Sequence, residues 1–276
     1  MKAFVVGEDR RADYTEGLPE QVVKGSDLFI AVQEDDDPVG LAAFRAEGDV
    51  FLLMWICVRE EYRQRGAGTL LMGAAKDILR DAGADSMQAI YTLNDDTAVL
   101  HDFLEEQQMR ELTEESRPVF SFCYGDIDDR YRGKKAVRTE KLSEVNEGRW
   151  TYYVSEYYKT AEQEGSEVLP IGDKAMYDPE LSIVQADEKK NITGLILISR
   201  SGDDLVLEHL STKEKGDVSK LLELLQAAID GAEGKVKPEA KLSFCAVNDK
   251  INKLAESISG NKLVQTGISV IQVYEF

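Results

Sequence analysis

The stretch Arg63-Gln64-Arg65-Gly66-Ala67-Gly68 follows an apolar run and precedes a segment in which apolar side chains recur at helical spacing. We predict a strand at 50–58 and a helix at 68–83, with Gly83 at the position of a C-terminal cap. The stretch therefore lies in the turn from a strand to a helix. Backbone N–H groups at a helix N-terminus lack partners within the helix and lie at the positive end of its dipole. Such a turn binds phosphate groups without a metal ion.

The residue types of this stretch suit a diphosphate. Gly66 and Gly68 keep side chains away from the phosphate oxygens, and Arg63 and Arg65 add charge-assisted hydrogen bonds. The glycine spacing is neither the Rossmann nor the Walker pattern, and no Lys-Ser or Lys-Thr pair follows. The alternative is an ordinary glycine-rich turn with solvated arginines. We interpret residues 63–68 as a short pyrophosphate-binding turn, here called the cradle.

Strands and helices are predicted on both sides of the cradle, and their order occurs twice. In the first half the predicted strands are 2–6, 28–33, 39–45, 50–58, 86–93 and 119–124, with helices at 18–24, 68–83 and 97–108. In the second half the predicted strands are 136–141, 181–186, 194–199, 205–210 and 241–247, with helices at 145–161, 218–232 and 250–257. Residues 263–276 are predicted to form a final strand or a hairpin. This order predicts an α/β class with a mixed sheet in each half.

Three pairs of residues put the halves in register to within four positions. Gly194 follows Gly40 and Asn248 follows Asn94 by 154 positions, and Gly216 follows Gly66 by 150. A chance coincidence of glycines and small polar residues is the alternative, but the repeated order of elements favours duplication of one domain. We predict a first domain at 1–125, a polar linker at 126–135 and a second domain at 136–276.

The composition excludes several classes of partner. The formal net charge is −19, and binding to nucleic acid depends on clustered Lys and Arg, so no nucleic-acid partner is expected. The acidic surface either concentrates cationic substrates or only keeps the protein in solution. No Cys/His cluster has metal-ligand spacing, so no metal is expected.

Cysteine usage and hydropathy indicate the compartment. The three cysteines, Cys57, Cys123 and Cys245, lie in apolar runs, which predicts buried free thiols in a reducing cytosol. No apolar run approaches the ~20 residues that span a bilayer. The N-terminus lacks the apolar region and cleavage site of a signal peptide. We expect a cytoplasmic protein with no membrane partner.

In this context the cradle resembles the pyrophosphate loop of the GNAT superfamily of acyl-CoA N-acyltransferases, Arg/Gln-x-x-Gly-x-Gly/Ala. The resemblance covers the order of elements from residue 39 to residue 107. It implies two tandem GNAT-like domains, each a mostly antiparallel mixed sheet flanked by helices. It also implies acetyl-CoA as the cosubstrate, transfer of the acetyl group directly to a primary amine of a small molecule or peptide, and no metal.

The resemblance also assigns the residues that bind the cofactor. The strand before the loop would splay from its neighbour and offer its backbone to the pantetheine arm, and Asn94 would lie near the thioester. The implied cofactor-binding residues are Ile56, Cys57, Val58, Arg63, Gln64, Arg65, Gly66, Ala67, Gly68, Thr69 and Asn94.

The candidate acid and base depart from the family pattern. Many members have a Tyr in the helix after the Asn as the acid for the thiolate, and here His101 falls near that position. Tyr91 and Tyr124 are substitutes, although each also suits a core position. The strand before the cradle lacks the Glu that some members use as a base, which leaves a water, Glu60 or Glu61. The candidate catalytic residues are His101, Tyr91 and Glu61.

The second half lacks an equivalent cradle. Residues 213–218 place Val218 where the second glycine would be and add the negative charge of Asp217. We predict that the second half is a degenerate copy of the first domain. It either forms one wall of the substrate cleft or stiffens the first domain. Its tyrosine-rich helix at 145–161 either lines an acceptor pocket or packs at an interface. The whole chain is expected to be an N-acetyltransferase, and the alternative is a non-catalytic acyl-CoA-binding or partner-binding protein. The acceptor amine and the oligomeric state are left open.

Overall fold

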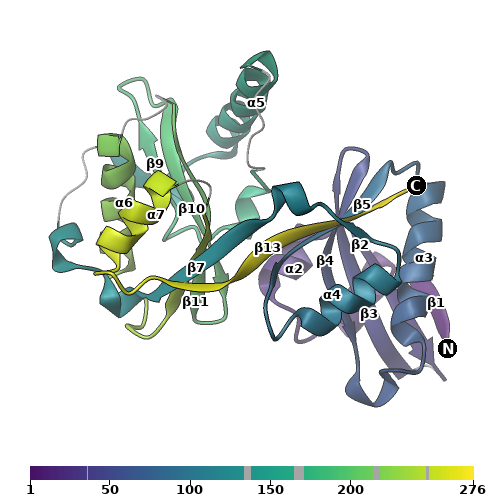
Figure 1. The fold of residues 1–276 in the computed structure, drawn as a ribbon. Helices are drawn as coiled ribbons and strands as arrows, with labels where there is room; N and C mark the ends of the chain where they lie inside the picture. The colour runs from purple at the N-terminus through teal and green to yellow at the C-terminus, as the bar shows by residue number, and fades with distance from the viewer. Residues whose placement is uncertain (36, 134–137, 165–170, 214–217, 247–248) are drawn as a thin grey trace. The chain divides into compact units, whose positions relative to one another are not determined.

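The computed structural model describes all residues except 36, 134–137, 165–170, 214–217 and 247–248 (Figure 1). The chain forms two compact units, and each is described by itself. Unit 1 consists of Met1–Pro118 together with Gly267–Phe276, and unit 2 consists of Val119–Thr266. The last residues of the chain therefore belong to the same unit as the first.

Unit 1 is a mixed sheet with helices on both faces. In spatial order its strands are β1 (Lys2–Val5), β2 (Leu28–Glu34), β3 (Asp37–Glu47), β4 (Val50–Val58), β5 (Ser86–Leu93) and β13 (Val264–Glu275), with the short β6 (Arg110–Glu111) paired to β13. Neighbouring strands are antiparallel except for β4 and β5, which are parallel. The helices are α1 (Arg11–Thr15), α2 (Glu20–Gly25), α3 (Ala67–Asp81) and α4 (Ala98–Glu106).

Alternation along the strands sorts the core of unit 1 into two layers. Ile30 and Val32 of β2 pack in a cluster with side chains of α3 and α4. Phe29 and Ala31 of the same strand pack in a second cluster with side chains of α1 and α2. Successive side chains of a strand point to opposite faces, so one continuous apolar run serves both layers.

The sheet of unit 1 opens next to the cradle. β4 and β5 pair only from Val50 to Leu52 and from Ser86 to Gln88. β4 nevertheless continues to Val58, which pairs with Gly40 on its other side. Among the described strands, the second half of β4 therefore has one edge without a partner. The splayed strand implied by the family resemblance is confirmed.

Unit 2 has the same plan. Its strands follow the spatial order β7 (Arg117–Cys123), β12 (Lys241–Cys245), β11 (Asp204–Thr212), β10 (Ile192–Ser201), β9 (Ile183–Ala186) and β8 (Thr139–Lys141). α6 (Val218–Ala232) and α7 (Asp249–Ile258) cover one face of this sheet, and α5 (Glu147–Glu164) covers the other (Figure 1). The parallel pair is β11 with β12, and it joins only Leu205–Leu207 to Leu242–Phe244.

A β-bulge occurs at the same place in both units. The pairing of β3 with β4 shifts between Ala43–Trp55 and Phe44–Leu53, which leaves Met54 unpaired. The pairing of β10 with β11 shifts between Leu197–His209 and Ile198–Leu207, which leaves Glu208 in the equivalent position 154 residues later. Bulges are retained features of a fold rather than accidents, so their agreement supports the duplication.

The two glycines that set the register also have matching surroundings. A Cβ on Gly40 would lie 2.9 Å from the carbonyl oxygen of Cys57 and 3.1 Å from Cδ1 of Leu71. A Cβ on Gly194 would lie 3.1 Å from the carbonyl oxygen of Ser211 and 3.1 Å from Cδ1 of Leu224. Both glycines are required where a strand passes under the first helical turns. The tandem arrangement is confirmed.

The edge strands are exchanged along the chain. Residues 119–124 were expected to complete the first half, but β7 pairs with β12, for example Phe122 with Leu242. The place beside β5 is taken by β13, from Ile268 opposite Leu93 to Glu275 opposite Ser86 (Figure 1). The compact units thus divide the chain differently from the expected ranges 1–125, 126–135 and 136–276. The physical reason is that duplicated sheets present similar edges, so either strand fits either sheet.

The expected linker is partly ordered against unit 2. The short 3-10 helix Tyr124–Asp126 ends at its first residue, and a second one, Asp129–Tyr131, lies within it. Ile127 between them is buried in the cluster that contains α6 and α7. Residues 134 and 135 of the expected linker lie outside the described residues.

Candidate functional site

The cradle is an exposed turn with free backbone donors. Gly66 occupies the N-cap position of α3 with φ of +83°, and Gln64 also has a positive φ of +56°. Within the described residues, the amides of Arg65–Thr69 make no backbone hydrogen bond. Successive amides pointing out of such a turn form a concave site for an anion. The turn thus has the donors that a diphosphate requires.

The two arginines of the cradle already have neighbours. Arg63 donates from Nε to the carbonyl oxygen of Val58 at 3.0 Å. Arg65 lies 3.2 Å from a carboxylate oxygen of Glu34, and its guanidinium stacks over the ring of Tyr62 with 5.0 Å to the centroid. These contacts hold both guanidinium groups at the mouth of the turn. An incoming phosphate would compete with Glu34 for Arg65.

The two glycines of the cradle have different roles. No heavy atom lies within 4 Å of a Cβ built on Gly66, so its requirement is the left-handed backbone. A Cβ on Gly68 would lie 3.1 Å from Cε2 and Cζ of Phe103 on α4. Gly68 therefore allows α4 to approach α3, a packing role that the sequence did not reveal. Of the two, Gly66 is the cleaner probe of the anion site.

The open edge of β4 contains the predicted residues Ile56, Cys57 and Val58. Cys57 is exposed, as is Cys245, so the expectation of buried thiols was wrong for these two residues. For Cys57 the reason is that β4 has no partner on this side beyond Leu52, which leaves an apolar strand partly open to solvent. An extended ligand can pair with such an edge.

Asn94 lies at the start of α4. Its Oδ1 accepts hydrogen bonds from the backbone N–H of Asp96 at 3.0 Å and of Thr97 at 3.2 Å. The Thr97 hydroxyl in turn donates to the carbonyl oxygen of Thr92 at 2.7 Å. Asn94 thus forms the turn that starts the helix. Its Nδ2 has no partner among the described residues and stays available to a ligand.

The structure brings two of the three candidate catalytic residues together. The hydroxyl of Tyr91 on β5 lies 2.8 Å from Nδ1 of His101 on α4. Burial raises the pKa of Tyr91 to about 12, with further contributions from the carboxylates of Glu111, Glu105 and Asp102. The Tyr91 hydroxyl therefore keeps its proton at neutral pH.

Carboxylates surround the other ring nitrogen of His101. Nε2 lies 3.7 Å from Glu105 and 3.8 Å from Glu111, and the His101 side chain is 15% exposed. Glu111 also accepts a hydrogen bond from the Ser116 hydroxyl at 3.0 Å. This end of unit 1 is therefore acidic and partly open to solvent.

Sequence reasoning missed one member of this cluster. The Tyr91 hydroxyl donates to Oε1 of Gln272 at 2.8 Å, and Gln272 is fully buried. Gln272 lies on β13, 181 positions away in the chain. No local pattern links two residues at this separation, and only the strand exchange brings them together.

The remaining candidates lie elsewhere. Glu60 and Glu61 occupy the exposed 3-10 helix Glu60–Tyr62 after β4, and neither has an ion-pair partner among the described residues. Tyr124 is buried in unit 2, where its hydroxyl donates to the carbonyl oxygen of Ile229 at 2.9 Å. Tyr124 is therefore a core residue and no substitute acid.

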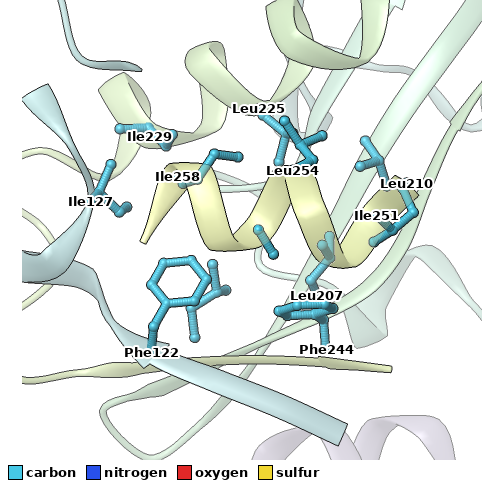
Figure 2. A pocket seen from close by; sticks show the side chains of 12 residues that line it. Phe122, Ile127, Leu207, Leu210, Leu225, Ile229, Phe244, Ile251, Leu254 and Ile258 are labelled. Carbon is cyan, nitrogen blue, oxygen red and sulfur yellow. The ribbon is translucent and has the colours of Figure 1, made fainter. Parts of the chain in front are cut away.

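The equivalent region of unit 2 is apolar. A cavity of about 50 Å³ lies between α6, α7 and the strands β7, β11 and β12, and its lining side chains are drawn in Figure 2. Its lining is aliphatic and aromatic: Phe122, Ile127, Leu207, Leu210, Leu225, Ile229, Leu242, Phe244, Ile251, Leu254, Ala255 and Ile258. Residues 214–217, and with them Asp217 of the expected degenerate cradle, lie outside the described residues. The lining of this cavity offers no hydrogen bond to a nucleotide.

The described part of the chain has neither a metal-ligand cluster nor a membrane-spanning helix. No group of three or more His, Cys, Asp or Glu side chains in it could hold a metal ion. None of its helices has the length and apolar character needed to cross a bilayer.

Comparison with known proteins agrees with this geometry. Residues 3–107 match the model of the acetyltransferase (GNAT) family. No curated protein matches the sequence. A tandem GNAT protein from the clavulanic acid biosynthesis pathway has a similar structure, with a TM-score of 0.63 at 10% identity, covering 99% of this chain and 98% of the other.

Two further solved structures are similar. A GCN5-related N-acetyltransferase from Anabaena variabilis gives a TM-score of 0.58 at 12% identity, with 99% and 72% of the chains covered. A putative acetyltransferase from Pyrococcus horikoshii gives 0.56 at 13%, with 99% and 89% covered. At these identities the structural likeness shows the fold, and the match of residues 3–107 adds the family. Residues 3–107 therefore form an acyltransferase domain of the GNAT family, and the chain as a whole has the fold of a tandem GNAT protein.

Proposed function

We propose that unit 1 is an acetyl-CoA-dependent N-acetyltransferase that transfers the acetyl group directly to a primary amine of a small molecule or peptide. One observation carries the proposal: five consecutive free amides at the start of α3 lie next to an open edge of β4. The first feature suits a diphosphate and the second suits an extended amide-containing arm. Acetyl-CoA contains both.

The residues present fit this cofactor. The amides of Arg65–Thr69 would hold the pyrophosphate, with Arg63 and Arg65 adding charge. The backbone of Ile56, Cys57 and Val58 would pair with the pantetheine arm, and Nδ2 of Asn94 would face it. When bound, the cofactor supplies the acetyl group as a thioester.

The reaction needs an acid and a base. The amine nitrogen forms a bond to the acetyl carbonyl carbon while the carbon–sulfur bond breaks, so the amine loses one proton and the sulfur gains one. We assign the proton for the sulfur to the Tyr91–His101 pair, because the Tyr91 hydroxyl remains protonated and is hydrogen-bonded to the ring. Glu61, exposed after the end of β4, or a water molecule is the expected base.

The charge of the site favours a cationic acceptor. Glu105 and Glu111 lie within 4 Å of His101, and the chain has a net charge of −19. An acidic field raises the local concentration of ammonium groups. Amines with several positive charges, or basic peptides, are therefore the proposed acceptor class.

A matched pair of glycine variants tests the cofactor site. Gly66 and Gly48 both have positive φ, and both have open space around a built Cβ. Alanine at either position costs a similar ~1 kcal/mol of backbone strain. We expect Gly66→Ala to lose the thermal stabilisation by acetyl-CoA, while Gly48→Ala keeps it. Equal stabilisation of the two variants would refute the cradle assignment.

Thiol release with a panel of amines then tests the activity. Release with polyamines or basic peptides supports the enzyme. Acetyl-CoA binding without release from any amine would favour the alternative, a non-catalytic acyl-CoA-binding protein.

A further inference from the structure

Gln272 is a buried polar residue without an evident structural task. It lies on β13 opposite Ala89 of β5 on one side and Glu111 of β6 on the other. Its Oε1 accepts the hydrogen bond from Tyr91, while its Nε2 is buried and has no partner among the described residues. A buried unpaired amide is costly, and an apolar side chain would avoid that cost. Its presence therefore points to a role in the network that it joins.

The network links the carboxamide to the ring of His101. The Tyr91 hydroxyl has a single proton, which it gives to Oε1 of Gln272. Its oxygen must then accept from Nδ1–H of His101, 2.8 Å away. The neutral ring of His101 therefore carries its proton on Nδ1. Its unprotonated Nε2 faces Glu105 and Glu111.

The amide thus decides where the proton of the pair resides. With the carboxamide reversed, Gln272 would donate to Tyr91, and Tyr91 would donate to Nδ1, so the ring would carry its proton on Nε2. With an apolar residue at position 272, Tyr91 would retain His101 as its one partner in this network. The orientation of the carboxamide therefore selects the tautomer, and without the carboxamide the Tyr91 proton is free to turn toward Nδ1.

We propose that Gln272 is a positioning residue that sets the tautomer of His101 and the direction of the Tyr91 hydroxyl. The proposal rests on the proposed function, in which this pair protonates the departing sulfur. Because Gln272 lies in the last strand of the chain, the proton chemistry of unit 1 is complete only after residues 267–276 have joined its sheet.

Nitrogen NMR of the histidine rings tests the positioning directly and without activity. The chain has two histidines, and His209 in unit 2 serves as an internal reference. At a pH where the rings are neutral, wild-type His101 should carry its proton on Nδ1. Gln272→Leu should move it to Nε2, because Tyr91 then donates to Nδ1. Gln272→Glu keeps an acceptor when its buried carboxyl is ionised, and at such a pH it should keep the wild-type tautomer.

Kinetics test whether the positioning matters for the reaction. Gln272→Leu should lower kcat about tenfold with the KM for acetyl-CoA unchanged, and Gln272→Glu should restore most of the rate. Adding Gln272→Leu to Tyr91→Phe should cause no further loss. Val273→Ala, at the neighbouring buried residue on the opposite face of the strand, controls for packing.

Three outcomes would overturn the proposal. An unchanged tautomer in folded Gln272→Leu removes the positioning role. A changed tautomer with an unchanged kcat removes its link to the reaction. A rate loss in Val273→Ala equal to that in Gln272→Leu reduces the effect to packing. Failure of the proposed function would give a different result, because wild-type protein would then release no thiol with any amine, whatever the tautomer of His101.

Discussion

Units 1 and 2 share a backbone frame but differ in the chemistry placed on it. Both keep the bulge at Met54 and Glu208, and both keep the glycine that passes under the first helix. These features are set by main-chain geometry, and a Cβ in place of either glycine would disturb it. The site residues carry no such constraint. The frame of a duplicated domain therefore persists while its site diverges.

The bulged strands illustrate the difference. Trp55 of β4 pairs with Ala43, and the equivalent residue in β11 is His209, which pairs with Leu197. His209 is 3% exposed, and burial lowers its pKa to about 4. Its Nε2 lies 2.8 Å from the Ser211 hydroxyl. Unit 2 thus holds a neutral histidine in its core, whereas His101 of unit 1 lies among carboxylates.

Deleting residues 267–276 should have the largest effect on stability. It also tests whether the last strand belongs to unit 1, as the strand exchange requires. The deletion removes the strand beside β5, so unit 1 should unfold, while the strands β7 to β12 of unit 2 keep their pairings with one another. The two tryptophans report the units separately, Trp55 in unit 1 and Trp150 in unit 2. Fluorescence during urea unfolding should lose the transition of Trp55 and keep that of Trp150. Loss of the Trp150 transition instead would show that the last strand completes the second half.

Lowering the pH should distinguish the stabilities of the two units, with a smaller effect than the deletion. The folded pKa of His209 lies below its unfolded value of about 6.5, so its contribution to stability is complete above pH 6.5 and is lost as the pH falls toward 4. This lowering of the His209 pKa corresponds to about 3 kcal/mol for unit 2. Urea unfolding followed at Trp150 between pH 7 and 4 measures it. His209→Phe should remove this part of the pH dependence, and an unchanged slope in that variant would assign it to other groups.

The smallest expected effect tests the equivalence of the two glycines. Gly40→Ala and Gly194→Ala each place a Cβ about 3 Å from a carbonyl oxygen of the neighbouring strand. Each should destabilise its own unit by about 1–3 kcal/mol, the usual cost of overpacking. The Trp55 transition should shift in the first variant and the Trp150 transition in the second. Unequal losses would show that the frames have begun to diverge.

Much of the fold was predictable because it depends on local patterns. The helix predicted at 218–232 matches α6, and the strand predicted at 50–58 matches β4. The helix predicted at 97–108 is two residues too long at its C-terminal end and begins one residue early. Helical and strand periods are read within one segment, which is why these elements were found. The short α1 at Arg11–Thr15 was missed because five residues show no clear period.

The candidate site was predictable in part. The cradle follows from the order strand, glycines and helix, and the structure places Gly66 at the N-cap as that order requires. The Tyr91–His101 hydrogen bond did not follow, since spacing alone does not fix how a strand side chain meets the next helix. The roles of the cofactor-binding residues stay predictions until a ligand is bound.

By itself, the sequence determined the elements, their duplication and the position of the phosphate-binding turn, because each is encoded over a few neighbouring residues. Only the tertiary structure decided which strand lies beside β5, and with it that Gln272 reaches Tyr91. A strand's period of two fixes which side chains face the core, but its backbone hydrogen bonds are the same for any partner. The choice between β7 and β13 is made by the packing of whole sheets.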